Sequence, residues 1–173
     1  MTLEGRIAVV TGVTSDIGRA IALRLAAEGS AVAVTGNTPA KVERVAKDLK
    51  SAGARFFAEA LDLTASETVE QFFARVAEGF GPTDILVNGA AWRVRSSFLE
   101  TTYADWRKTF AGCVESYFYC SLAAARQMVP RKWGRIIHIG SIASAVLMAP
   151  FAAYTAAKGA VHALAKAMAG DGM

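Results

Sequence analysis

The sequence predicts an α/β fold in which a parallel sheet is covered by helices on both faces. Short apolar runs alternate with helical patterns of roughly 10–20 residues along the chain, which is typical of βαβ units. Hydrophobic residues make up 53% and charged residues 20% of the 173 residues, which suits strands buried on both faces. Right-handed crossovers then give a doubly wound sheet. Because no linker, repeat or low-complexity tract divides residues 1–173, we expect a single domain.

Five short apolar runs, several rich in β-branched residues, are the predicted strands. A strand buried inside a parallel sheet has a continuous apolar run rather than an alternating one. The runs cover residues 6–11, 31–35, 54–60, 84–88 and 134–141.

The helices are predicted from their end signals and their periodicity. Thr38 followed by Pro39 is typical of a helix start, and Thr64 with Glu67 has the spacing of a capping box. Glycine marks the C-terminal ends of several of these helices. The first predicted helix ends at Gly29, and the others cover 38–53, 64–79, 102–130 and 152–169.

Composition excludes several classes of protein. The apolar runs are short and broken by glycine or charge, so no membrane span is expected, and the start of the chain lacks a secretory signal pattern. The net charge of +4 is mild and its lysines and arginines are scattered, which gives no case for nucleic acid. Cys113 and Cys120 lie about 10 Å apart along a helix, too far for a disulfide, so we expect a reducing, cytoplasmic setting.

A glycine-rich turn follows the first strand. The segment TGVTSDIG, residues 11–18, places Gly12 and Gly18 between a strand and a helix, where helix N–H groups can bind phosphate. The alternative is a plain strand-to-helix turn. Asp16 stands where such loops usually have glycine, which permits a left-handed φ that aspartate tolerates only moderately. We also expect its carboxylate to weaken anion binding through its charge or by capping the helix.

A serine, a tyrosine and a lysine form the second signal. Ser141 ends the fifth strand, where open α/β sheets bind ligands, and Tyr154 and Lys158 share one face of the last helix. An ammonium near a phenol favours the phenolate, and a serine hydroxyl can hold a substrate oxygen, so the three could pass a proton to or from an alcohol or carbonyl oxygen. The alternative is an ordinary i,i+4 pair on the surface.

Taken together, TGVTSDIG, DILVNGAA, Ser141, Tyr154 and Lys158 strongly resemble the short-chain dehydrogenase/reductase family from residue 5 to the end of the chain. The resemblance implies a Rossmann fold with strand order 3-2-1-4-5, a nicotinamide cofactor and hydride transfer at a carbonyl carbon. It also implies that Tyr154 is the general acid/base and that Ser141 stabilises the substrate oxygen. Lys158 would promote ionisation of the tyrosine and hold the nicotinamide ribose.

The same resemblance implies a set of cofactor-binding residues. Gly36 and Asn37 end the second strand without an acid that favours NAD or an arginine that grips the extra phosphate of NADP, so either cofactor fits, with a weak preference for NADP. No metal site is expected, because His138 and His162 have no paired ligands. The implied cofactor contacts are Gly12, Thr14, Ser15, Asp16, Ile17, Gly18, Asn37, Asp62, Leu63, Asn88, Ala90, Tyr154 and Lys158.

The chain departs from the family pattern in four places. Besides Asp16, Gly89 stands where an asparagine would brace the sheet, and Cys113 stands where an asparagine usually holds a proton-relay water. A buried thiol at that position is expected to be core filler. The family usually continues for two more strands and a segment that covers the substrate, and these are missing from the sequence.

These observations predict an NAD(P)-dependent oxidoreductase that interconverts a ketone and a secondary alcohol. A 3-oxoacyl-thioester reductase is the commonest role that the resemblance implies, with a small-molecule substrate and, for a full-length chain, a homo-oligomer. The alternative from another class is a catalytically inactive nucleotide- or partner-binding member, or a fragment, of the same fold. Asp16, Cys113 and the missing strands motivate that alternative.

Overall fold

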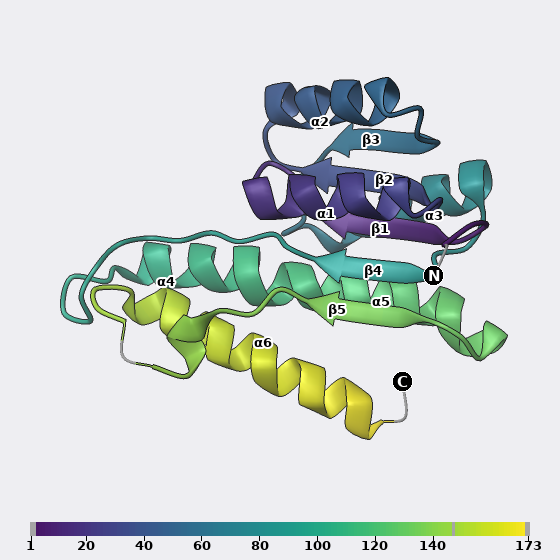
Figure 1. The fold of residues 1–173 in the computed structure, drawn as a ribbon. Helices are drawn as coiled ribbons and strands as arrows, with labels where there is room; N and C mark the ends of the chain where they lie inside the picture. The colour runs from purple at the N-terminus through teal and green to yellow at the C-terminus, as the bar shows by residue number, and fades with distance from the viewer. Residues whose placement is uncertain (1–2, 147, 172–173) are drawn as a thin grey trace.

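In the computed structural model, which describes residues 3–146 and 148–171, five parallel strands form one sheet in the order β3-β2-β1-β4-β5. Their arrows point the same way in Figure 1. The predicted fold class and strand order are therefore confirmed. The strands are β1 (Ile7–Thr11), β2 (Ala31–Gly36), β3 (Phe56–Ala60), β4 (Ile85–Asn88) and β5 (Arg135–His138).

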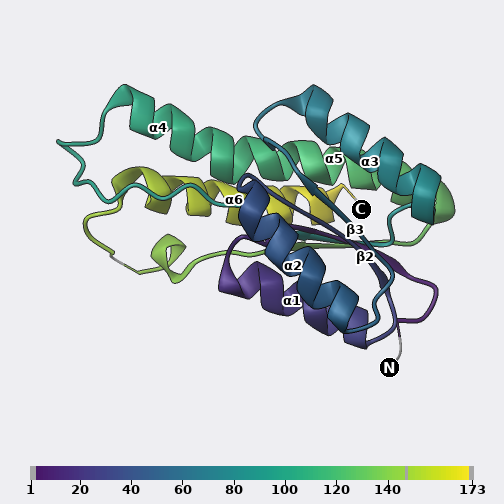
Figure 2. The ribbon, with the colours of Figure 1, turned by 90° about the horizontal axis from the view of Figure 1, so that it is seen from above.

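Helices cover both faces of the sheet (Figure 2). Helices α1 and α2 lie on one face, and α3, α5 and α6 lie on the other, where α4 continues into α5. Within the described residues, no helix combines the length and the apolar character that a membrane crossing requires. The helices are α1 (Asp16–Ala27), α2 (Pro39–Ser51), α3 (Ser66–Phe80), α4 (Tyr103–Phe110), α5 (Ser116–Met128) and α6 (Ala152–Gly170).

Alternate residues of the central strands supply two separate cores. Val9 and Leu86 face the core beneath α3 and α5, whereas Val10 and Val87 face the core on the side of α1 and α2. All four are almost completely buried. Each such side chain contributes about 1.5–3 kcal/mol of hydrophobic free energy, which explains why β1 and β4 are apolar at every position except the last, Thr11 and Asn88.

Two helix predictions need correction. No capping box forms at Thr64, because its hydroxyl donates to the Asp62 carboxylate at 2.8 Å and α3 begins two residues later with Ala65 as its N-cap. The predicted helix over 102–130 also changes its winding partway along. Between α4 and α5, residues Ala111–Glu115 form a π-helical segment, η1, and a short 3₁₀ turn, η2 (Val129–Arg131), follows α5.

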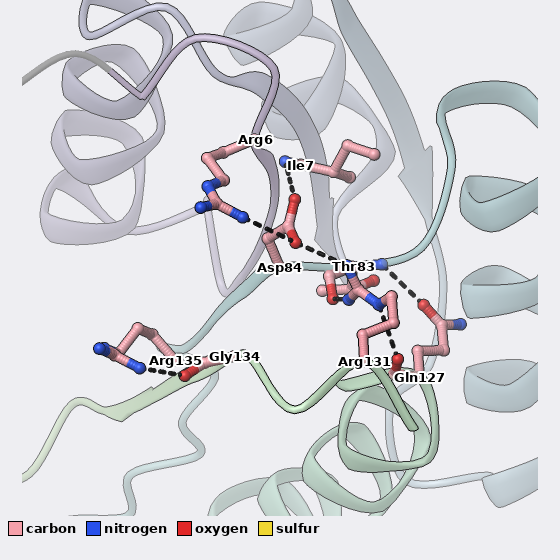
Figure 3. A network of polar contacts seen from close by, with 8 residues as sticks. All are labelled: Arg6, Ile7, Thr83, Asp84, Gln127, Arg131, Gly134 and Arg135. Atoms are coloured by element: carbon pink, nitrogen blue, oxygen red, sulfur yellow. Dashed lines mark hydrogen bonds and ion pairs between the residues drawn. The ribbon is translucent and has the colours of Figure 1, made fainter. Parts of the chain in front are cut away.

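A polar network, drawn in Figure 3, connects strands at their amino ends. These ends lie at the edge of the sheet opposite the predicted site. The Asp84 carboxylate is buried, accepts the Ile7 N–H at 3.0 Å and pairs with the Arg131 guanidinium at 2.7 Å. Arg131 also donates to the Thr83 carbonyl, and the Thr83 N–H donates to Gln127 at 2.8 Å. The network therefore links the starts of β1 and β4 to the turn that leads into β5.

Candidate functional site

A cleft of about 610 Å³ opens at the carboxyl ends of the strands. Its walls come from the β1–α1 loop, from the ends of β2, β3 and β4, and from α4 and η1. This is where the strand order reverses between β1 and β4, the usual ligand position in a doubly wound sheet. It is lined by Gly12, Thr14, Ser15, Gly36, Asn37, Pro39, Ala60, Leu61, Asp62, Leu63, Thr64, Gly89, Ala90, Ala91, Trp92, Lys108, Ala111, Gly112 and Ser116.

The glycines of the β1–α1 loop allow two backbone segments to approach closely. Gly12 has a φ of +72°, and a Cβ there would lie 2.5 Å from the Ala90 nitrogen and even closer to the Gly89 carbonyl. A Cβ on Gly18 would lie 2.5 Å from the Gly12 oxygen. Both glycines are therefore required by the packing of the loop against β4 and α1.

The start of α1 offers donors to an anion. The Ser15 hydroxyl caps the helix by accepting the Gly18 N–H at 3.1 Å. The N–H groups of Asp16 and Ile17 have no hydrogen-bond partner among the described residues. Open N–H groups at the positive end of a 12-residue helix, beside a cleft lined by Gly12 and Ser15, fit the phosphates of a dinucleotide.

Asp16 does not act as the sequence led us to expect in two respects. It is the first residue of α1 in ordinary helical conformation, so its position does not require the left-handed φ that glycine tolerates. Its carboxylate does not cap the helix, because Ser15 does so. What remains of the hypothesis is the charge, since Asp16 is exposed beside the open N–H groups at the start of α1.

The ends of β2 and β3 form the far end of the cleft. Asn37 lies beside Gly36 and Thr14, and the Asp62 carboxylate accepts both the N–H and the hydroxyl of Thr64. Leu63 lines the same wall and is buried. Of the residues that line the cleft, Asp62 and Lys108 alone carry charge.

Sequence reasoning left one wall of the cleft largely unassigned. The Lys108 ammonium lies 3.8 Å from the centre of the Trp92 ring, and a Cβ on Gly112 would approach the Trp92 Cβ to 2.9 Å. The Cys113 thiol, expected to be core filler, is buried and bridges the backbone N–H and carbonyl of Trp92 at 3.3 Å each. The η1 segment therefore supports Trp92, a contact that helical periodicity could not reveal.

Asn88 and Gly89 follow β4. Asn88 is fully buried, and its amide lies 3.0 Å from the Ser121 hydroxyl and 3.2 Å from Nδ1 of His138. It therefore ties β4 to α5 and β5 and is not among the side chains that line the cleft. At Gly89 a Cβ would lie 2.8 Å from the Thr11 carbonyl, so the missing asparagine has no ready space here.

The remaining predicted residues lie after β5 and on α6. The short η3 turn (Ile142–Ser144) packs against α6, so the Ser141 segment lies alongside the helix that carries Tyr154 and Lys158. The Ser141 hydroxyl oxygen accepts the Ala143 N–H at 3.2 Å, and its own proton has no partner among the described residues. A serine held in this way can donate to a substrate oxygen.

Lys158 is not a surface residue. Its side chain is 2% exposed, and its Nζ lies 5.9 Å from the centre of the partly buried Tyr154 ring. Nζ donates to the Ile139 carbonyl at 2.7 Å and to the Tyr117 hydroxyl at 3.1 Å. Burial lowers the pKa of Lys158. The alternative of an ordinary exposed i,i+4 pair is therefore wrong.

The described residues contain no group of three or more histidine, cysteine or acidic side chains arranged to hold a metal. His138 lies beneath Tyr117 with the ring centres 5.4 Å apart, and His162 is exposed on α6.

Comparisons with known proteins agree with this geometry. A family model described as short chain dehydrogenase matches residues 6–172. The 3-oxoacyl-[acyl-carrier-protein] reductase FabG of Pseudomonas aeruginosa is 31% identical over 98% of this chain and 68% of its own length. A crystal structure of NAD⁺-bound xylitol dehydrogenase superposes with a TM-score of 0.95 at 30% identity, covering 99% of this chain and 66% of that one. A variant of actinorhodin polyketide ketoreductase with NADPH gives a TM-score of 0.92 at 29% identity, covering 97% and 66%.

The chain is shorter than its relatives. It spans 64–66% of the length of three curated relatives that are 32–37% identical to it. The match of the family model nonetheless extends over almost all of the sequence, and it includes the glycine turn, Ser141, Tyr154 and Lys158. The chain belongs to the short chain dehydrogenase family.

Proposed function

We propose that this chain is the nucleotide-binding and proton-transferring part of an NAD(P)-dependent oxidoreductase that interconverts a ketone and a secondary alcohol. The observation that carries the proposal is the buried Lys158 ammonium beside Tyr154, which donates to the Ile139 carbonyl two residues before Ser141. A buried ammonium acts on a phenol ring 5.9 Å away with little screening by water. A surface pair screened by water would have little such effect.

Each of the three side chains has a defined task in this proposal. The Tyr154 hydroxyl gives a proton to the carbonyl oxygen during reduction and takes it back during oxidation. The Ser141 hydroxyl donates a hydrogen bond to the same substrate oxygen, and Lys158 stabilises the phenolate and holds a ribose hydroxyl. The bound nicotinamide supplies or accepts the hydride. Gly12, Ser15 and the N–H groups of Asp16 and Ile17 would hold its phosphates.

Substitution of Tyr154 by phenylalanine tests this function. The variant keeps the ring but loses the transferable proton, so we expect turnover to fall by about 10²–10⁴-fold. The binding of NADPH, followed by the fluorescence of the reduced nicotinamide, should change little. Turnover is measured as NADPH oxidation with a 3-oxoacyl thioester and a panel of small ketones. A Tyr154→Phe variant that keeps wild-type turnover would remove the mechanism.

We also propose NADP rather than NAD as the preferred cofactor. The cleft has no acid at the end of β2 to repel a ribose phosphate. Parallel titrations with NADPH and NADH measure the preference directly. Equal or tighter binding of NADH would contradict it.

The inactive nucleotide- or partner-binding protein remains the second candidate. The specific observation in its favour is that two of the three Lys158 N–H donors already bond to protein atoms, at Tyr117 and Ile139. The two candidates differ in one result. Tight NADPH binding without turnover, for any carbonyl in the panel, would favour the binding protein.

The substrate and the assembly complete the proposal. A 3-oxoacyl thioester is proposed because the P. aeruginosa relative is named for that reaction, and the xylitol dehydrogenase likeness adds a keto sugar to the assay panel. A homo-oligomer is proposed because Phe118 and Leu122 on α5 are 48% and 38% exposed. Sedimentation velocity measures its size.

The buried free thiols of Cys113 and Cys120 suit a reducing compartment such as the cytoplasm.

A further inference from the structure

We propose that Tyr117 is a positioning residue that fixes the Lys158 ammonium and leaves a single N–H of that group for a ligand. This inference rests on the proposed function, since it assigns a partner to the lysine of that site. Tyr117 lies on α5, 41 residues away from Lys158 in sequence, and no motif of the sequence points to it.

The geometry of the contact is specific. The Tyr117 hydroxyl donates to the Ile139 carbonyl at 3.2 Å and lies 3.1 Å from Nζ of Lys158. Nζ also donates to the Ile139 carbonyl, at 2.7 Å. The phenol, the ammonium and the carbonyl therefore form a closed triangle just beyond the end of β5.

The surroundings keep the phenol neutral. Tyr117 is 0% exposed, and its burial raises the pKa of its hydroxyl. Cys113, Cys120 and Tyr154 raise that pKa further, because a nearby thiolate or phenolate would repel a second negative charge. A phenol that keeps its proton has one hydrogen to donate, which goes to Ile139, and a lone pair to accept the Lys158 N–H. This role is therefore positional, and Tyr117 is not an exit for protons.

The number of N–H donors on Lys158 determines how many remain for a ligand. An ammonium has three N–H groups, and Tyr117 and Ile139 take two of them. These two bonds fix rotation about the last bond of the side chain. The third N–H therefore points in one fixed direction, in which it can donate to a ligand. Without the phenol the ammonium would keep one protein bond and would turn about it.

The titratable groups that face Lys158 come from each neighbouring element. They are Cys113 on η1, Tyr117 on α5, His138 on β5 and Tyr154 on its own helix. Burial lowers the pKa of Lys158, whereas Cys113 opposes that change. A hydrogen bond from the ammonium to the Tyr117 oxygen stabilises the charged form, so its loss should lower the pKa of Lys158 further.

Replacement of Tyr117 by phenylalanine tests the inference without any need for activity. Phenylalanine keeps the ring that stacks on His138 and removes only the hydroxyl. With ¹³C-labelled lysine, the pH titration of the Lys158 Cε resonance, assigned by its loss in Lys158→Met, should move to lower pH by about one unit. Tyr119→Phe is the matched control, because the Tyr119 hydroxyl has no hydrogen bond among the described residues and lies on the same helix. An unchanged titration in Tyr117→Phe would overturn the inference.

The pH dependence of catalysis separates this inference from the proposed function. In an active protein, Tyr117→Phe should move the falling limb of kcat/KM at high pH to lower pH, because Lys158 loses its charge at a lower pH. A structural role alone would lower the rate without moving that limb. If Tyr154→Phe abolishes turnover while Tyr117→Phe leaves the limb in place, the function stands and the positioning role fails. If Tyr154→Phe keeps turnover, the function itself fails.

Discussion

Two glycines with similar backbone angles have different tasks in this molecule. Gly12 and Gly53 both adopt a left-handed φ, +72° and +69°. At Gly53 a Cβ would meet nothing within 4 Å, whereas at Gly12 it would meet the backbone of Gly89 and Ala90. The sequence marks both as glycines at the ends of elements, and only the structure shows that one of them is a point of close approach.

This pair gives a prediction at the scale of the residue. Gly53→Ala should cost about 1–2 kcal/mol of unfolding free energy, the cost of a left-handed φ on a residue with a Cβ. Gly12→Ala should cost more and should also abolish NADPH binding, because the loop must move away from β4 to admit the methyl group. Urea denaturation and nucleotide titration measure both effects. Equal stability losses in the two variants would contradict the close packing of the loop.

At the scale of the element, local patterns predicted where strands and helices occur but not how they meet. The positions of the five strands and of the helices could be predicted from the sequence, because apolar runs and glycines mark them. The capping box predicted at Thr64 does not form, because the Thr64 hydroxyl donates to the Asp62 carboxylate. The winding of η1 and the Lys158–Tyr117 contact depend on side chains from distant elements, on which periodicity carries no information. The roles of Ser141, Tyr154 and Lys158 stay predictions until the substitutions above are measured.

His138 on β5 gives a prediction about acid stability. Its Nδ1 lies 3.2 Å from the Asn88 amide, which donates to it when the imidazole is neutral. Burial, and then the nearby Lys158 charge, lower the pKa of His138. The unfolded chain therefore takes up a proton near pH 6.5 that the folded chain resists, and the unfolding free energy falls as the pH drops below that value.

The two histidines of the chain allow a controlled measurement. We expect His138→Gln to reduce the loss of unfolding free energy between pH 7.5 and pH 5 relative to the wild type. His162→Gln should leave that loss unchanged, because His162 is exposed on α6. Urea denaturation at several pH values measures the difference. The same pH dependence in all three proteins would show that His138 is not held in its neutral form.

At the scale of the whole molecule, the sheet carries the cleft at one end and the polar network that joins its strands at the other. The carboxyl ends of the strands form the cleft, and the amino ends are joined through Asp84. Asp84 connects β1, β4 and the turn before β5, so a change there acts on the three strands that flank the site. The expectation of a single domain can be tested at the same residue.

Replacement of Asp84 by asparagine should destabilise the whole sheet. The change removes the buried charge that holds the Arg131 guanidinium and weakens the bond to the Ile7 N–H, and we expect a loss of about 2–4 kcal/mol. Glu43→Gln breaks an exposed pair with Lys47 that water and salt screen, so it should cost much less. If residues 1–173 form one domain, far-ultraviolet circular dichroism and tryptophan fluorescence should give one coincident urea transition in both variants, because the two cores share the same strands. Two separate transitions would contradict the single domain, and equal losses in the two variants would contradict the structural role of Asp84.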